Sequence, residues 1–320
     1  MPNSQGADRR WRGAFLGAIA ALLTSGCSAV AIGYHFAPTF VYWRLDQALD
    51  FDTGQAADVR ARLDRLHAWH RRSELADYAG FLGELQTRIG PPVSAADVTW
   101  LHDEVRRRYT RILDATGADA VDVVVALRGE QIDALERRFA RMRADFTRQR
   151  VDVGPERARE DMYHHALEVL ERWYGAFDDG ALNRLRRLAD EIPLDTRLEL
   201  EDLRRRQGEL LAFLRSVSAG KLTAREETGE RLKRLFGRPE EGSAVDYADY
   251  VVRNRTALHR FYAEAATLAK PEQRERARRK LQHYIDEIAA LAPPRIASRA
   301  SAPPEPHGRN LKQIGPPGRP

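Results

Sequence analysis

Residues 127–146 read LRGEQIDALERRFARMRADF, and their large apolar side chains recur every three or four positions. The members of this stripe are Ile132, Leu135, Phe139, Met142 and Phe146. Such spacing places the apolar residues on one side of an α-helix and leaves the other side to charged residues. Because one amphipathic helix cannot shield its own stripe from water, the segment predicts packing against further helices.

The same periodicity extends over most of the chain. Residues 75–89, 98–112, 162–173, 200–214 and 251–268 each carry a comparable stripe, and no convincing alternating run indicates strands. We therefore predict an all-α fold, an irregular array of antiparallel helical hairpins within residues 51–292. Glycine and proline at residues 237–243 mark the best candidate for a boundary inside this domain.

Helix starts recur in form along this region. An apolar residue, a capping or turn residue and then an acid or amide follow one another at residues 51–55, 93–97, 127–131, 177–180 and 222–226. Asp52 with Gln55 has the spacing of a capping box, as has Thr223 with Glu226. The Gly-Pro-Pro of residues 90–92 is expected to end the preceding helix. The spacing between starts is irregular, which argues against a true repeat.

The N-terminus has the pattern of a secretory signal. Arg9, Arg10 and Arg12 precede an apolar run over residues 14–23, which is too short to span a bilayer. The sequence LTSGC then ends at Cys27, the only cysteine of the chain. This pattern resembles the bacterial lipobox, which implies cleavage of residues 1–26 and acylation of the Cys27 thiol, palmitate being a typical chain.

A lipid on Cys27 predicts both a location and a constraint. Ser28 replaces the aspartate that is associated with retention at the inner membrane, so we expect an outer-membrane lipoprotein facing the periplasm. With its one thiol acylated, the mature chain can form no disulfide, and its stability must come from helix packing. No other cofactor is expected.

The basic net charge does not indicate a nucleic-acid partner. The chain carries +5 in total, of which the signal contributes +2 and residues 293–320 contribute +4, so residues 27–292 are nearly neutral at −1. Phosphate backbones are bound by grooves rich in lysine and arginine, which this balance does not predict. Residues 293–320 hold eight of the 16 prolines and few large apolar side chains, and we expect a disordered tail.

Residues 27–50 form an aromatic segment directly after the predicted anchor. It contains Tyr34, His35, Phe36, Phe40, Tyr42 and Trp43. Aromatic side chains near a lipid anchor favour the bilayer interface. They can equally form the first element that packs onto the helical core, and we favour packing.

Several segments together resemble a family of uncharacterised proteobacterial lipoproteins, described as a domain of unknown function. The resemblance rests on residues 45–46 with 51–52, on Trp69-His70-Arg71-Arg72 with Leu75 and Tyr78, on residues 172–175 and on residues 205–207. It implies a lipoprotein and no particular chemistry. Separately, Leu127-Arg128-Gly129-Glu130-Gln131 resembles the Leu-Thr-x-x-Gln signature of small periplasmic stress chaperones, with Arg128 in place of threonine.

Two histidine-containing groups are candidates for chemistry. Asp161, His165 and Glu168 have spacings of four and three, so they can share a helix face and hold a metal, with His164 beside them. We favour surface positions for these residues, because the second face of the same helix carries core residues. His67 and His70 are three residues apart and are candidates for a pH-sensing pair, although a polar face beside Trp69 explains them as well.

The aromatic pair Trp173 and Tyr174 precedes a turn at Gly175. We interpret it as an aromatic cap closing a hairpin, with a partner-binding corner as the alternative. The sequence has no Gly-x-Ser-x-Gly elbow and no glycine-rich phosphate loop after a strand. Its carboxylates alternate with arginines at salt-bridging helical spacing, which is typical of a solvated face.

Three classes of function remain open. The first, which we favour, is a non-enzymatic binding or scaffold module that receives an envelope protein or peptide between its helices. The second is a chaperone-like or envelope-stress protein, and the third is a metal-dependent hydrolase that uses Asp161, His165 and Glu168. The expected partners are the membrane, through the lipid, and an envelope protein; nucleic acid is not expected.

Overall fold

The computed structural model describes residues 29–90, 92–237 and 243–293, and within them the chain is helical without any strand. This confirms the all-α prediction. The helices are α2 (Ala29–His35), α3 (Ala37–Leu49), α4 (Thr53–Ser73), α5 (Leu75–Arg88), α6 (Ala95–Val125), α7 (Gly129–Phe146), α8 (Gly154–Tyr174), α9 (Asp179–Asp190), α10 (Thr196–Ser218), α11 (Arg225–Gly237), α12 (Val245–Leu268) and α13 (Pro271–Leu291). A π-helical turn, η1 (Thr147–Val151), joins α7 to the segment before α8.

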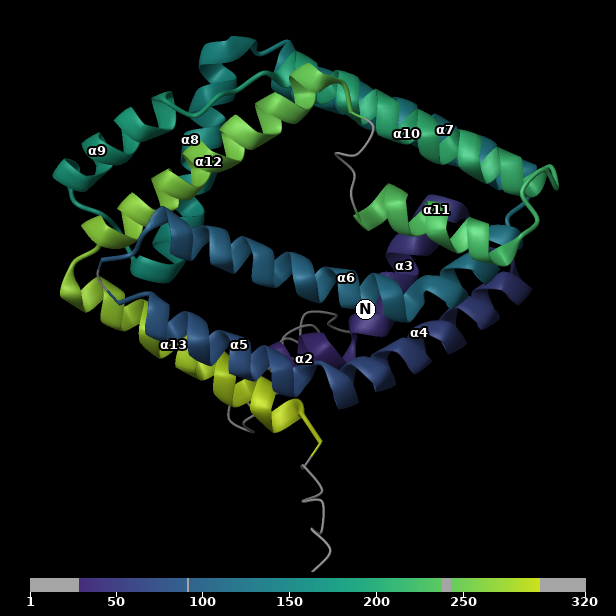
Figure 1. Cartoon of the computed structure of the whole chain (residues 1–320), viewed down its shortest axis with the longest axis horizontal. Helices are drawn as coiled ribbons and strands as arrows, with labels where there is room; N and C mark the ends of the chain where they lie inside the picture. The colour runs from purple at the N-terminus through teal and green to yellow at the C-terminus, as the bar shows by residue number, and fades with distance from the viewer. Residues whose placement is uncertain (1–28, 91, 238–242, 294–320) are drawn as a thin grey trace, which may run out of the picture.

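The helices form an open, diamond-shaped frame that α6 crosses (Figure 1). The main packing partners are distant in sequence: α5 packs on α13, α6 on α11 and α12, and α7 on α10. These pairs run antiparallel. For example, Arg71 Nε, just before α5, donates to Leu291 O (3.0 Å), while Gln86 Nε2 near its end donates to Arg278 O (3.1 Å). Long-range antiparallel pairing therefore closes the frame.

The predicted caps position the helix starts. The Asp52 side chain accepts from Gln55 N (2.9 Å), and the Gln55 side chain accepts in return from Asp52 N (3.1 Å). Ser94 and Asp97 form the same reciprocal pair at the start of α6. Each cap satisfies backbone N–H groups that have no partner inside the helix. The predicted capping box of Asp52 with Gln55 and the predicted helix start at residues 93–97 are confirmed, and α5 ends at Arg88, before the Gly-Pro-Pro segment.

The start of α7 is tied to two other helix ends. Gln131 is buried, and its Nε2 donates to the carbonyls of Leu49 and Asp50 at the end of α3, each at 2.9 Å. The side-chain amides of Gln131 and Gln55 also bond each other, at 2.9 and 3.2 Å. Gln131 Oε1 accepts from Arg128 N (2.9 Å). Gln131, the last residue of the segment Leu127-Arg128-Gly129-Glu130-Gln131, thus holds three helix ends together.

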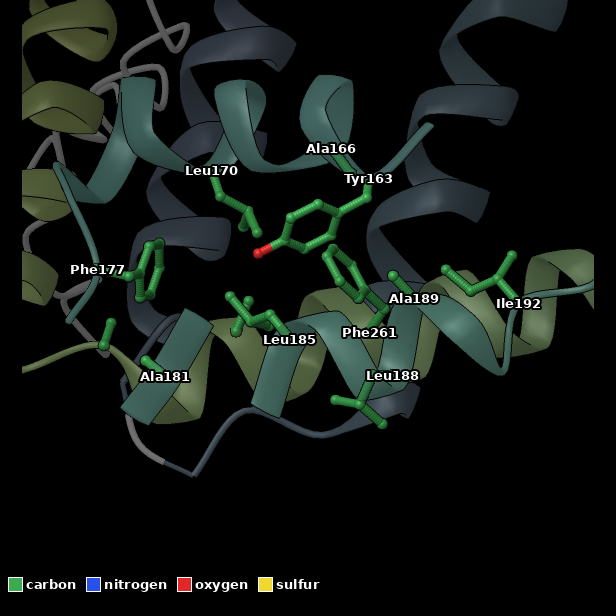
Figure 2. Close-up of a cluster of buried hydrophobic side chains, with 12 residues drawn as sticks. Tyr163, Ala166, Leu170, Phe177, Ala181, Leu185, Leu188, Ala189, Ile192 and Phe261 are labelled. Carbon is green, nitrogen blue, oxygen red and sulfur yellow. The ribbon is translucent and has the colours of Figure 1, made fainter. Parts of the chain in front are cut away.

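Most of the buried apolar residues belong to one of two clusters. In the first, Tyr163 and Leu170 of α8 and Leu185 of α9 point toward Phe261 of α12 (Figure 2). Phe261 and Leu185 have no exposed surface. The second cluster joins α6, α7, α10 and α11 around residues such as Phe213, which is 1% exposed. The clusters share no buried residue, so each end of the frame has a core of its own.

Several predictions concern residues outside the described ranges. They are the signal segment, the acylated Cys27, the tail from residue 294 and most of the boundary at residues 237–243. Across the described residues, no helix combines the length and the apolar character that crossing a bilayer requires.

Candidate binding cavities along helix α6

Two large open cavities lie beside α6. The first, here called the α12 cavity, has a volume of about 950 Å³ and is lined by α6, α7, α10 and α12. The second, the α11 cavity, has a volume of about 800 Å³ and is lined by α6, α7, α10 and α11. Leu203 and Arg206 of α10 line both cavities. The two cavities therefore meet at α10. The volume of each lies in the range of ordinary ligand-binding sites.

The walls of the cavities are mostly apolar. Val105 of α6 and Met142 of α7 line the α12 cavity, and each is 53% exposed. Tyr109 (43% exposed) and Phe236 (46% exposed) line the α11 cavity. Large apolar side chains that gather with this exposure in a concave surface are typical of a binding site rather than of ordinary surface.

This exposure corrects part of the sequence interpretation. The periodic stripes predict that Val105, Tyr109 and Met142 are buried against other helices, and this is wrong for all three. The stripe of α6 extends beyond the surfaces that cover it, because α12 packs near the start of α6, where Thr99 contacts His259, and α11 packs nearer its end, where Asp114 pairs with Lys233. Periodicity alone does not show where a stripe is left uncovered, so no sequence pattern indicates the cavities.

The charged residues give the cavities a positive balance. The two lining carboxylates already have partners: Glu199 accepts from Tyr250 Oη (2.5 Å), and Glu209 pairs with Arg205 (2.9 Å). By contrast Arg231 and Arg234 at the α11 cavity, and Arg255 at the α12 cavity, form no ion pair with any other part of the chain that the structure describes; Arg231 lies over the ring of Phe213. The groups left without a counter-charge are thus all cationic.

Arg206 is held in place between the cavities. Its Nε donates to Asp202 Oδ2 (2.7 Å), and the buried Asp202 also accepts from Arg205 and from Ser243 Oγ (3.0 Å). A side chain fixed in this way loses little further conformational freedom when a ligand binds.

Neutral polar groups also line the α12 cavity. Burial and the hydrogen bond to Glu199 raise the pKa of Tyr250. Burial, together with the nearby His102 and Arg255, lowers the pKa of His259, whose Nδ1 lies 2.9 Å from Thr99 Oγ1. At neutral pH these side chains can exchange hydrogen bonds with a ligand without adding charge.

The three residues predicted as candidate metal ligands, Asp161, His165 and Glu168, do not form a metal-binding cluster. His165 and Glu168 are exposed on α8, and Asp161 pairs with Arg157 (2.9 Å). In the described ranges no three His, Cys, Asp or Glu side chains gather closely enough to hold a metal ion. His164 instead lies 2.6 Å from Glu160.

Trp173 and Tyr174 pack inward between helices. The Trp173 ring lies 5.9 Å from the Tyr284 ring of α13, and Lys280 Nζ lies 5.1 Å from its centre. Tyr174 packs against the first apolar cluster, 6.1 Å from Phe177, and its burial raises its pKa. These contacts fit the aromatic cap better than a partner-binding corner.

His67 and His70 both contact α2. His70 Nδ1 lies 3.0 Å from Tyr34 Oη, His70 Nε2 lies 3.2 Å from Tyr78 Oη, and His67 Nε2 lies 3.0 Å from Tyr34 O. Burial lowers the pKa of His70. The pair belongs to a junction of α2, α4 and α5 and is remote in sequence from the residues lining the two cavities.

Comparison with known proteins gives one relationship. No curated protein and no solved structure proved similar to this chain. The model of a family of unknown function, DUF6279, matches residues 47–248, which include α4 to α11 and all of the α11 cavity. Because this match spans more than half of its length, the chain belongs to the DUF6279 family of unknown function.

Proposed function

We propose that this protein is a non-enzymatic binding module of the cell envelope, anchored by a lipid on Cys27. Its two cavities along α6 receive an amphipathic helix of a partner protein. The observation that carries this proposal is the uncovered apolar wall formed by Val105, Tyr109, Met142 and Phe236. A helix laid in a groove buries its apolar face through anchors spaced three and four residues apart, and cavities of this size can accept such anchors.

Charge indicates the character of the partner helix. Arg231, Arg234 and Arg255 lie at the cavities without a counter-charge in the described chain. Opposite charges across an interface speed association and fix the register of the partners. The partner helix should therefore carry aspartate or glutamate beside its apolar anchors.

The anchor is supported by the sequence pattern that ends at Cys27. Stable anchoring needs more than one acyl chain, as lipoproteins with several chains on one cysteine have. Intact-mass measurement of protein from its host should show a chain that begins at an acylated Cys27. Cys27→Ser should leave the protein uncleaved or soluble, and normal membrane fractionation of that variant would refute the anchor.

The cavities can be tested by photo-crosslinking in cells. A photo-reactive amino acid at position 142, inside the α12 cavity, should yield a discrete adduct whose cross-linked peptide is an acidic amphipathic helix. The same residue at position 149, an exposed site that lines neither cavity, is the control. No specific adduct at position 142 would contradict the proposal, and a broad mixture of unrelated clients would favour the chaperone alternative.

Charge reversal tests the chemistry of the partner. Arg231→Glu with Arg234→Glu should reduce the yield of the adduct several-fold, because the partner's carboxylates would then meet like charge. Arg137→Glu changes an exposed arginine of α7 that lines neither cavity, and it should leave the yield unchanged. Equal yields from the reversed and control variants would show that the partner is not acidic.

A further inference from the structure

An exposed apolar surface lies on α2 and α3, away from the two cavities. Ile32, Phe36, Phe40 and Trp43 are 41%, 57%, 61% and 49% exposed. Phe36 N donates to Ile32 O (3.1 Å) and Phe40 N donates to Phe36 O (3.0 Å), so the helical pattern continues across the joint between α2 and α3. Spacings of four, four and three place these side chains on one side, here called the α2–α3 outer face.

The opposite side of the same segment already packs on the frame. Tyr42 stacks on Phe51 with ring centres 6.4 Å apart, and the Arg60 guanidinium lies 3.9 Å from the centre of the Tyr42 ring. Tyr34 contacts His67 and His70 of α4. The segment is thus apolar on both sides although only one side faces the core. A helix on a water-exposed surface normally carries polar residues on its outer side.

We propose that the α2–α3 outer face rests in the headgroup region of the lipid bilayer that carries the anchor. This inference rests on the proposed acylation of Cys27. Ala29, the first residue of α2, follows Cys27 by two positions, a span of at most about 7 Å of extended chain. A lipid on Cys27 therefore brings the start of α2 to the membrane surface.

The composition of the face matches that environment. Phenylalanine and tryptophan are the residues of interfacial helices, and tryptophan is enriched at the headgroup level. Arg44 follows Phe40 by one helical turn, is exposed, and forms no ion pair with the rest of the described chain, so it is free to meet a lipid phosphate. The only carboxylate within α2 and α3, Asp46, is half-buried and accepts from Phe51 N (3.2 Å).

Site-directed spin labelling of the lipidated protein tests this contact. The protein is purified from host membranes and reconstituted into vesicles of phosphatidylethanolamine and phosphatidylglycerol. Phe40→Cys and Glu130→Cys, both at exposed positions, are labelled with a nitroxide. The label at position 40 should be several-fold more accessible to oxygen, relative to a water-soluble nickel chelate, than the label at position 130.

Equal accessibility at the two positions would overturn the membrane contact. Spin–spin broadening at position 40 would also overturn it, because it would show a second copy of the chain on this face. The parent protein, labelled in parallel, tests the anchor independently: an acylated Cys27 takes up no label, whereas a free thiol takes up one. The proposed anchor and the proposed face can therefore fail separately.

Discussion

His70 lies where three helices meet, with a tyrosine hydroxyl near each ring nitrogen. Tyr34 belongs to α2 and Tyr78 to α5. His67, which lies on α4 together with His70, disfavours a positive charge on His70, whereas Glu74 favours that charge. Glu74 itself is buried and paired with Arg111 of α6 (2.6 Å). Burial is the largest of these effects, and it lowers the pKa of His70.

This junction should weaken as the pH falls. Because the folded protein binds a proton at His70 less readily than the unfolded chain, whose histidines titrate near pH 6.5, the unfolded state gains protons first. The stability contribution of neutral His70 is thus complete above about pH 6.5 and is lost as the pH falls from there toward the lowered pKa.

We expect His70→Gln to reduce the loss of stability between pH 7.5 and pH 5.5. Glutamine keeps a hydrogen-bonding side chain and does not titrate. Urea unfolding at both pH values gives the comparison, with His165→Gln at an exposed position of α8 as the matched control. If His70→Gln and its parent lost equal stability over this range, the neutral histidine would not be what holds the junction.

At the scale of whole helices, the caps were the most predictable feature. Asp52 with Gln55 was readable as a capping box because such a box depends only on residues three apart, and residues 93–97, which include Ser94 and Asp97, were readable as a helix start. The link from Gln131 to the end of α3 was not readable, because it joins residues more than eighty positions apart. Local chemistry reveals where a helix begins, whereas its contacts with other helix ends depend on the assembled frame.

The Gln131 junction gives the prediction for this scale. Gln131→Leu keeps the size of the side chain but leaves the carbonyls of Leu49 and Asp50 without their donor. Loss of the hydrogen bonds to these groups should reduce the free energy of unfolding by about 2–4 kcal/mol. Gln149→Leu, on an exposed part of η1, should change it by less than about 0.5 kcal/mol.

Denaturant titrations of the two variants and their parent provide the measurement. Equal midpoints for Gln131→Leu and Gln149→Leu would show that water replaces the lost donor at the three helix ends.

At the scale of the molecule, the sequence predicted helices and failed to predict the spaces between them. The stripe of α6 reads like a core stripe from Val98 to Ile112, yet Val105 and Tyr109 line open cavities. The part of a stripe that is covered depends on the positions at which the long helices cross each other. No local sequence pattern indicates these positions. For the same reason the sequence did not show that most of the buried apolar residues belong to two separate clusters.

The two clusters should unfold as separate units. They share no buried residue, and the α12 cavity opens between α12, which supplies Phe261 to the first cluster, and α7 and α10, which belong to the second. Local units of a protein open independently where few buried contacts join them. Phe261→Ala and Phe213→Ala each remove a ring that is at most 1% exposed, at a cost of about 3–5 kcal/mol within its own cluster.

Hydrogen exchange read by mass spectrometry distinguishes the two units. Phe261→Ala should speed exchange in α9 and α12 while α7 and the C-terminal half of α10 keep their protection, and Phe213→Ala should do the reverse. Each variant is the matched control of the other, because both remove the same side chain from an equally buried position. Uniform acceleration over all helices in either variant would mean that the frame unfolds as one unit, with α6 and α10 transmitting the loss from end to end.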